Sequence, residues 1–381
     1  MILSGIWRLP LKTKSLQSFY DKYSILFQLY FYAFVLSMAI AVGVVWKYSI
    51  DTVVECLSIS ILCSIVSMKT VVCQTESIKR LLRYILAKED ELKRSTDEES
   101  KRICIEHQNV AYFMTKLITS STATVGTFLL MTKFLLYWNM ERHQTYPNVT
   151  MYRKKPLPYI TWLPFNSDDH YISAFSLHSI AAFIGTVFNS VTAIFYLTCM
   201  IFICCRLRIL QHRIKTMGTS MHQPELVIKT VLNSLIVDHQ TIIEYTEQFN
   251  NDINLILLVD FTLNSVQVAS IFFQLVTLKL SLLNLVFLTT YFGLTSLQIF
   301  SSAWFANEIK EQSLGVADAI CEHNWHEQSL SIQKTLMLMM TRAQKPLTLT
   351  VGPFSTMSNN TPITIMKASY SYVTLMTSKR E

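Results

Sequence analysis

Long apolar stretches separated by short polar segments dominate the chain. Seven of these stretches are long enough to cross a membrane as helices, because about 20 residues rising 1.5 Å each span a hydrocarbon core of roughly 30 Å. They cover residues 24–46, 53–73, 117–138, 172–205, 253–278, 280–304 and 361–378. The pattern predicts an all-α polytopic membrane protein with seven transmembrane helices.

Composition supports this class. Of the 381 residues, 51% are hydrophobic and 15% are charged, whereas soluble domains carry about 25% charged residues. The 8 glycines and 9 prolines are too few for the turns of a β-barrel. The net charge of +7 does not indicate nucleic-acid binding, because the basic residues occupy short segments between apolar spans and do not form one patch with aromatic residues.

The distribution of Lys and Arg predicts the orientation. Most of them precede the first span or lie in segments 74–110, 206–252 and 305–345. By the positive-inside rule, the amino terminus is cytosolic and the carboxyl terminus extracellular. Segment 139–171 is then extracellular, and its triplet Asn148-Val149-Thr150 predicts glycosylation of Asn148.

Apolar residues also repeat at helical spacing outside the spans, in residues 78–86, 225–250 and 305–342, the last with Trp325 embedded in it. Such helices bury their apolar stripes against one another or against neighbouring subunits. We therefore expect helical extensions on the cytosolic side and oligomerisation through them.

The last span carries a polar stripe, formed by Thr364, Lys367, Ser371, Thr374 and Ser378. Spacings of three and four residues place the stripe on one helical face. A helix that lines water or polar partners needs such a face. The alternative is ordinary packing of Ser and Thr between membrane helices.

Spans two, three, four and six combine aromatic with small polar residues, as pockets for small molecules do. The candidate ligand-pocket residues are Ser60, Phe128, Phe134, Tyr137, Phe175, His178, Phe183, Thr290 and Tyr291. Aromatic residues in membrane helices more often serve packing or an interfacial belt, which is the alternative for these positions.

Ionisable residues inside the spans are Lys133, Asp260 and Lys367, each a functional candidate by its place. Asp260 either pairs with a basic residue of another span or faces a wet vestibule. The pair His323-x-x-His326 has metal-ligand spacing but no third ligand nearby, so two surface histidines explain it better. A P-loop, a dinucleotide fingerprint, a zinc-protease motif and a nucleophile elbow are all absent from the sequence. We expect no enzyme, cofactor or metal.

Three ordered motifs give a family resemblance. They are PLTLTVGPF at Pro346–Phe354, ASYSYVTLM at Ala368–Met376, and FANEI at Phe305–Ile309, which is followed by Gln312-Ser313 and Trp325. Over essentially its full length the chain resembles insect odorant receptors.

The resemblance implies a division into residues 1–305, with six spans and their cytosolic extensions, 306–343, a cytosolic anchor region, and 344–381, a pore-lining helix and extracellular tail. The last transmembrane segment is thus split. The anchor, with Trp325, would join four subunits. The second half would line a cation pore, with Leu375 as gate, Ser371 and Thr374 on the pore face, and Ser378 and Lys379 at the outer mouth. Lys367 departs from this pattern, because a lysine repels cations.

The resemblance implies that the co-receptor of that family has an enlarged second cytosolic loop, which the compact 206–252 segment lacks. The chain therefore resembles a ligand-tuning subunit. The residues after Ser371-Tyr372 lack the second half of the gustatory receptor signature. The resemblance therefore implies a ligand-gated, non-selective cation channel subunit in the plasma membrane of sensory neurons. It would bind a small volatile organic ligand and assemble with co-receptor subunits in a tetramer surrounded by lipid. The alternatives are a gustatory-type channel, a metabotropic receptor or a secondary transporter.

Overall fold

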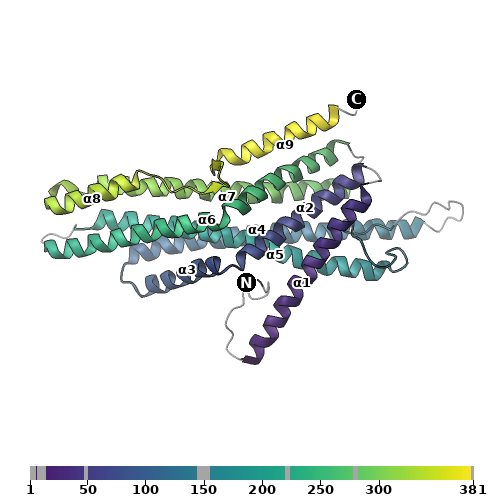
Figure 1. The fold of residues 1–381 in the computed structure, drawn as a ribbon, viewed down its shortest axis with the longest axis horizontal. Helices are drawn as coiled ribbons and strands as arrows, with labels where there is room; N and C mark the ends of the chain where they lie inside the picture. The colour runs from purple at the N-terminus through teal and green to yellow at the C-terminus, as the bar shows by residue number, and fades with distance from the viewer. Residues whose placement is uncertain are drawn as a thin grey trace.

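The computed structural model describes residues 6, 14–46, 50–143, 155–218, 224–277 and 282–378. These residues are almost entirely helical, and the molecule is elongated (Figure 1). The elements are α1 (Lys14–Val45), α2 (Ile50–Cys73), α3 (Glu76–Arg94), α4 (Glu98–His143), α5 (Tyr171–Thr216), α6 (Glu225–Thr277), α7 (Leu282–Glu322), η2 (Trp325–Glu327), α8 (Leu330–Ala343), β1 (Thr350–Val351), β2 (Ser355–Thr356) and α9 (Asn360–Ser378). We call the two ends of the molecule the α8 end, which also holds α3, and the α9 end.

Four helices are much longer than a membrane is thick. Helices α4 and α5 have 46 residues each and α6 has 53. A helix of that size is about 70–80 Å long, more than twice the hydrocarbon core, so it must project beyond it. Helix α7, with 41 residues, passes residue 305 without a break, although the sequence suggested the end of a span there.

The turn between α7 and α8 differs from the expected continuous helix. Trp325 lies in the 3-10 turn η2, not in an α-helix. His323, interpreted from sequence as a surface residue, is buried at 5% exposure, whereas His326 is exposed. The reason is the reversal of the chain here, which turns the end of α7 inward against α5 and α8.

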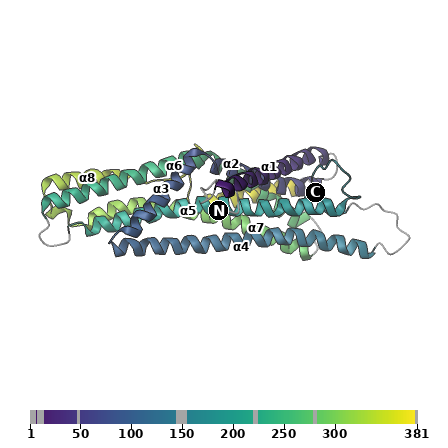
Figure 2. The same ribbon diagram turned by 90° about the horizontal axis from the view of Figure 1, so that it is seen from below.

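Helix α5 is the centre of the bundle. It packs against α4 and α7 and also contacts α2 and α6. Figure 2 shows α4 running beside it over most of its length. Fully buried side chains along α5 include Phe188, Met200 and Leu207. This central position explains why its apolar residues show no single-sided pattern.

Among the described residues, five helices are long and apolar enough to cross a membrane: α1, α2, α5, α6 and α7. Helix α4 falls short because Ser and Thr interrupt its apolar run. Its hydroxyl groups, however, bond to the helix itself: Thr122 Oγ1 donates to the Ile118 carbonyl at 2.8 Å, and Thr127 Oγ1 to the Ala123 carbonyl at 2.9 Å. Internal bonding of this kind lowers the cost of placing hydroxyls in lipid.

A short hairpin, β1 and β2, directs the chain from α8 into α9. Gly352, at its turn, has φ +60, and a Cβ atom there would lie 2.8 Å from Leu258 Cδ2 of α6. The Gly352 amide donates to the Asn254 carbonyl at 2.9 Å, and the Thr350 amide donates to Asn250 Oδ1 at 2.7 Å. The hairpin is therefore fixed to α6, and α9 leaves it to lie along α6 and α7.

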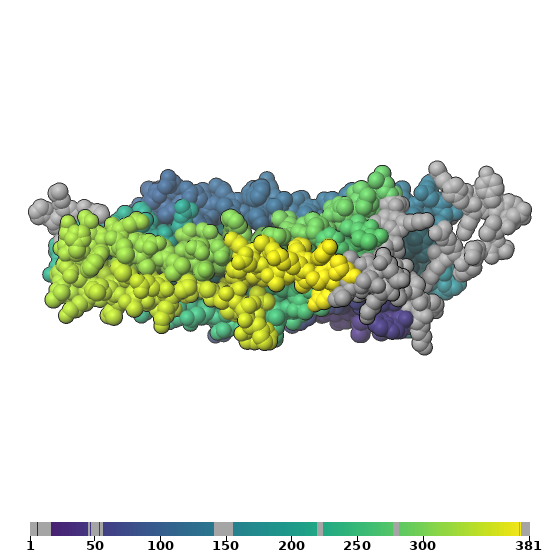
Figure 3. Space-filling view, turned by 90° about the horizontal axis from the view of Figure 1, so that it is seen from above, coloured from purple at the N-terminus to yellow at the C-terminus, as the bar shows by residue number. Residues whose placement is uncertain are grey.

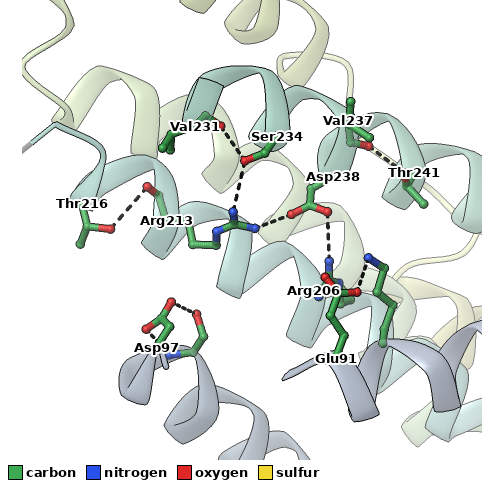
Figure 4. Close-up of polar contacts among 12 residues, drawn as sticks. Glu91, Asp97, Arg206, Arg213, Thr216, Val231, Ser234, Val237, Asp238 and Thr241 are labelled. Atoms are coloured by element: carbon green, nitrogen blue, oxygen red, sulfur yellow. Dashed lines mark hydrogen bonds and ion pairs between the residues drawn. The ribbon is translucent and has the colours of Figure 1, made fainter. Parts of the chain in front are cut away.

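At the α8 end, ion pairs connect α5 to α6 (Figure 4). Asp238 of α6 accepts from two arginines of α5: Arg213 Nη1 at 2.5 Å and Arg206 Nη2 at 3.5 Å. Arg213 also donates to Ser234 Oγ at 3.3 Å. Because Asp238 and Arg206 are largely buried, this cluster is screened less than surface pairs and holds the two long helices in register.

Candidate functional site

An apolar cavity of about 70 Å³ lies toward the α9 end, where α1, α2, α4, α5 and α7 meet. Its wall is mostly aliphatic and aromatic, with a few hydroxyl and amide groups. The lining residues are Phe31, Phe34, Ile59, Leu62, Cys63, Val66, Thr122, Val125, Gly126, Leu129, Tyr159, Ala181, Ala182, Gly185, Thr186, Asn189, Phe287, Tyr291 and Leu294. An apolar wall with few polar groups suits a small, mainly hydrophobic molecule.

Close approach of α4 and α5 shapes one side of this cavity. A Cβ atom on Gly126 of α4 would lie 2.7 Å from Thr186 Oγ1 of α5, so only glycine fits without displacing that hydroxyl. On the next turn of the two helices, Thr122 and Ser190 share a hydrogen bond of 2.6 Å. The wall is thus narrow and fixed in position.

Residues 155–170, which lead into α5, close the cavity. They place Tyr159, at 8% exposure, against Phe34 and His178, with ring centroids 5.2 Å and 5.7 Å away. The segment is tied to the bundle because the Trp162 amide donates to the Ser37 carbonyl at 3.2 Å. The Tyr171 hydroxyl donates to the Pro156 carbonyl at 3.1 Å. Tyr159 is therefore a cap held in place from both sides.

A second cavity, also of about 70 Å³, lies beside the first among α2, α4, α6 and α7. It is more polar, and we call it the polar annex. Its lining residues are Ser58, Ile59, Leu129, Thr132, Lys133, Gln274, Asn284, Phe287, Leu288 and Tyr291. Ile59, Leu129, Phe287 and Tyr291 line both cavities.

The nine candidate pocket residues lie at different places in the structure. Tyr291 lines both cavities. His178 lies behind the cap, where its ring Nε2 and the Thr161 hydroxyl are 2.9 Å apart. Ser60 is buried in α2, and Phe128 and Thr290 are half-buried, but the residues lining either cavity include none of the three.

The other four candidates lie away from the cavities. Tyr137 stacks on Tyr171 at 4.0 Å between α4 and α5. Phe134 and Phe175 pack on each other at 6.1 Å beside that pair. Phe183, with 63% exposure, points outward and suits contact with lipid.

Several lining residues were not predicted from the sequence. Phe31 and Phe34 belong to the first span and Tyr159 to the long connecting segment, neither of which showed a pocket-like composition. Gln274 of α6 lines the annex although the fifth span was not expected to contribute. The spacing of these residues along the sequence does not predict a pocket, because the cavities form only when separate elements meet.

The polar stripe of α9 points away from the rest of the chain. Thr364, Lys367, Ser371 and Thr374 are exposed, whereas Ile365 and Ser369 face α6. Ser369 Oγ donates to the Ser265 carbonyl of α6 at 2.9 Å. Figure 3 shows α9 at the surface of the bundle. The stripe is thus available to water or to another subunit.

Other predicted pore residues lie at the limit of what the structure describes. Leu375 and Ser378 belong to α9, but their side chains are outside the described part. Lys379 and Asn148 lie outside the described residues altogether.

Asp260 pairs with a basic residue of another span, the first of its two expected alternatives. Lys69 Nζ of α2 lies 2.8 Å from Asp260 Oδ2 of α6. Asn264 Nδ2 donates to the other carboxylate oxygen at 3.0 Å. The pair begins a row of buried polar residues on one face of α6, which continues through Gln267 to Gln274.

A metal centre finds no support in the described part of the chain, where no group of three or more His, Cys, Asp or Glu residues is suitably placed. His323 does not join His326, because the first ring is buried and the second points to solvent.

The sequence profile described as 7tm Odorant receptor matches residues 49–370. Odorant receptor 10 of Aedes albopictus is 31% identical over 184 residues, which are 48% of this chain and 48% of that receptor. Odorant receptor Or2 of Anopheles gambiae is 29% identical over 189 residues, 48% of this chain and 50% of that receptor. The aligned parts span about half the length of these curated relatives.

Similarity in three dimensions covers the whole chain. The insect olfactory receptor OR5 from Machilis hrabei, in complex with eugenol, matches with a TM-score of 0.78 at 17% identity, over 99% of this chain and 95% of that one. The structure of the same receptor described without eugenol matches with a TM-score of 0.76 at 17% identity, over 98% of this chain and 94% of that one. The two folds are the same.

Proposed function

Because this chain belongs to the seven-transmembrane odorant receptor family, we propose that it is a ligand-tuning subunit of an odorant-gated, non-selective cation channel. It is a multi-pass membrane protein. In this proposal it acts in olfactory transduction at the plasma membrane of sensory neurons, in a tetramer with co-receptor subunits. Its ligand is a small volatile organic molecule, and neither a nucleic acid nor a catalytic reaction is involved.

The observation that carries the proposal is the capped apolar cavity. Burial of apolar ligand surface releases about 25 cal/mol per Å², so a small hydrophobic molecule binds there without strict hydrogen-bond geometry. The cavity holds only about 70 Å³, far below the 300–1,000 Å³ of typical ligand pockets. A ligand therefore has to displace side chains and helices, and this couples binding to a change of shape.

Helix α7 connects the cavity to the proposed pore helix. Its residues Phe287, Tyr291 and Leu294 line the cavity, and the same helix packs against α9. Movement of α7 when a ligand enters would shift α9. A ligand that binds the open state about tenfold more tightly contributes about 1.4 kcal/mol toward opening at each site.

The exposed stripe of α9 supports its assignment to the pore. Hydroxyl groups such as those of Ser371 and Thr374 suit the passage of hydrated ions. A ring of Leu375 side chains would gate such a pore by excluding water, with Ser378 and Lys379 beyond it. Lys367 is exposed near the beginning of the stripe, far from Ser378. In a heterotetramer, partner subunits that lack a lysine at this position would reduce the positive charge around the pore.

The α8 end supports the assignment of the subunit anchor. Residues 306–343 form the end of α7, the η2 turn with Trp325, and α8, and they leave large apolar side chains exposed. Met337 and Leu338 have exposed fractions of 53% and 73%. In the proposed tetramer, neighbouring subunits cover this surface.

Co-expression with an odorant co-receptor in oocytes tests the proposal. We expect volatile panels to evoke cation currents that persist in excised patches without added nucleotide, which a metabotropic receptor would not give. Leu375→Ala is expected to increase the current without ligand. Surface expression without any ligand-evoked current would refute the channel function, and unchanged leak in Leu375→Ala would refute the gate.

A further inference from the structure

Two polar side chains face the ligand cavities from different helices. The Tyr291 hydroxyl of α7 is fully buried and has no hydrogen-bond partner. Gln274 of α6 has 7% exposure and lines the polar annex. A buried polar group without a partner costs about 1–3 kcal/mol, so the Tyr291 hydroxyl indicates a missing partner in the cavities.

The two cavities share part of their wall. Phe287 and Tyr291 stand one turn apart on α7 and stack with ring centroids 5.8 Å apart and planes 16° apart. Both rings line both cavities. Rotation of these rings would join the apolar cavity and the annex into one elongated site with an apolar part and a polar part.

The chemistry of the annex indicates which ligand atom it receives. The Tyr291 hydroxyl and the Gln274 amide can each donate as well as accept a hydrogen bond, Lys133 can only donate, and the annex wall includes no carboxylate. A ligand atom placed among them is therefore best a hydrogen-bond acceptor. An uncharged oxygen meets this need at low cost, because it loses less hydration than a charged group.

We propose that Gln274 and Tyr291 form a specificity site for the oxygen atom of an amphiphilic ligand, such as an alcohol, phenol, aldehyde or ketone, whose hydrocarbon part fills the apolar cavity. This inference rests on the proposed function and adds the chemical class of the ligand. It predicts discrimination between an oxygen-bearing molecule and a hydrocarbon of the same shape. It further implies that the fifth span, through α6, takes part in ligand recognition.

The test uses matched ligand pairs that differ only by a methyl group in place of a hydroxyl or a methylene group in place of a carbonyl oxygen. Suitable pairs are 1-octanol with nonane, 4-ethylphenol with 4-ethyltoluene, and 2-octanone with 2-methyl-1-octene. Apparent affinities come from the ligand-induced rise in unfolding temperature of the purified complex with co-receptor subunits in nanodiscs. The same pairs are applied to oocytes for current measurements.

The variants are Gln274→Leu and Tyr291→Phe, each of which keeps the size of the side chain and removes the hydrogen-bonding group. One lost hydrogen bond should reduce the preference for the oxygen member of a pair about fivefold to tenfold. Affinity for the hydrocarbon member should stay constant or rise, because the cavity becomes more apolar. The conservative Tyr291→Phe variant keeps the test valid if Gln274→Leu fails to fold.

Matched controls are Gln298→Leu and Tyr32→Phe, which remove buried, unpartnered groups outside both cavities. An equal preference for the oxygen member in wild type and both variants would overturn the inference. An equal loss of preference for the oxygen member in the control variants would overturn the inference as well. Discriminating binding without ligand-evoked current would refute the proposed channel function but support the specificity site, whereas no binding of any pair would refute both.

Discussion

Lys69 of α2 and Asp260 of α6 form a buried ion pair, with 2.8 Å between Nζ and Oδ2 and with both residues less than a tenth exposed. The Tyr196 hydroxyl, beside the pair, donates to the Lys69 carbonyl at 3.5 Å, and Asn264 bonds to the carboxylate. Charges inside a membrane protein are expensive, so each of the two is tolerated because of the other. The pair connects a helix that lines the ligand cavity to the helix on which α9 packs.

Removal of one member of this pair should destabilise the protein strongly. Asp260→Leu or Lys69→Met leaves an uncompensated buried charge, which costs about 3–5 kcal/mol. We expect loss of surface expression and a lower unfolding temperature for each single variant. The double variant Lys69→Met/Asp260→Leu should recover both properties, because it buries no charge. If the double variant were as unstable as the single ones, the pair would not be the source of the effect.

Truncation of the cap should weaken ligand binding. Tyr159→Ala removes a buried ring from the cavity wall, and with it the apolar contacts that the ring would make with a ligand. We expect the ligand concentration for half-maximal current to rise at least tenfold in co-expressing oocytes. Trp162→Ala is the control, since that side chain is 51% exposed in the same segment. Similar behaviour of the two variants would argue against a specific capping role.

The faces of α9 should differ in accessibility to water. Thr374 is exposed, whereas Ser369 is completely buried against α6. In Thr374→Cys, a positively charged methanethiosulfonate reagent applied during ligand exposure should reduce the current by more than half through repulsion of cations. Ser369→Cys should not react. Modification of Ser369→Cys alone would place the opposite face of the helix toward the pore.

Acidification should loosen the α8 end through His323. Burial lowers the pKa of His323 below its ordinary value near 6.5, because the charged ring loses hydration, while a hydrogen bond to the Lys215 carbonyl and the charge of Glu327 oppose this effect only partly.

The sign of the pH effect follows from the two states. As pH falls below about 6.5, the unfolded chain binds a proton at His323 more readily than the folded chain does, so stability decreases. His323→Gln should reduce the fall in unfolding temperature between pH 7.5 and pH 5.5. His326→Gln, at an exposed position, should follow the wild type. An unchanged pH dependence in His323→Gln would mean that other groups control it.

Much of the architecture could be predicted from the sequence. Apolar runs of membrane length indicate helices directly, since a backbone in lipid must satisfy its own hydrogen bonds. The polar stripe of α9 follows from its spacing, and its exposed members lie where helical geometry puts them. The sequence predicted that Asp260 either pairs with a basic residue or contacts water, because a charge inside a span needs a partner.

The ligand cavities and the partner of Asp260 depended on tertiary structure. Nine pocket candidates from spans two, three, four and six included Tyr291, but Phe34, Tyr159 and Gln274 came from elements whose composition gave no hint. Periodicity reports which face of one helix is buried and says nothing about which helices meet. Aromatic residues that fill a core, face lipid or line a cavity look alike in sequence, and only the packing of separate elements distinguishes them.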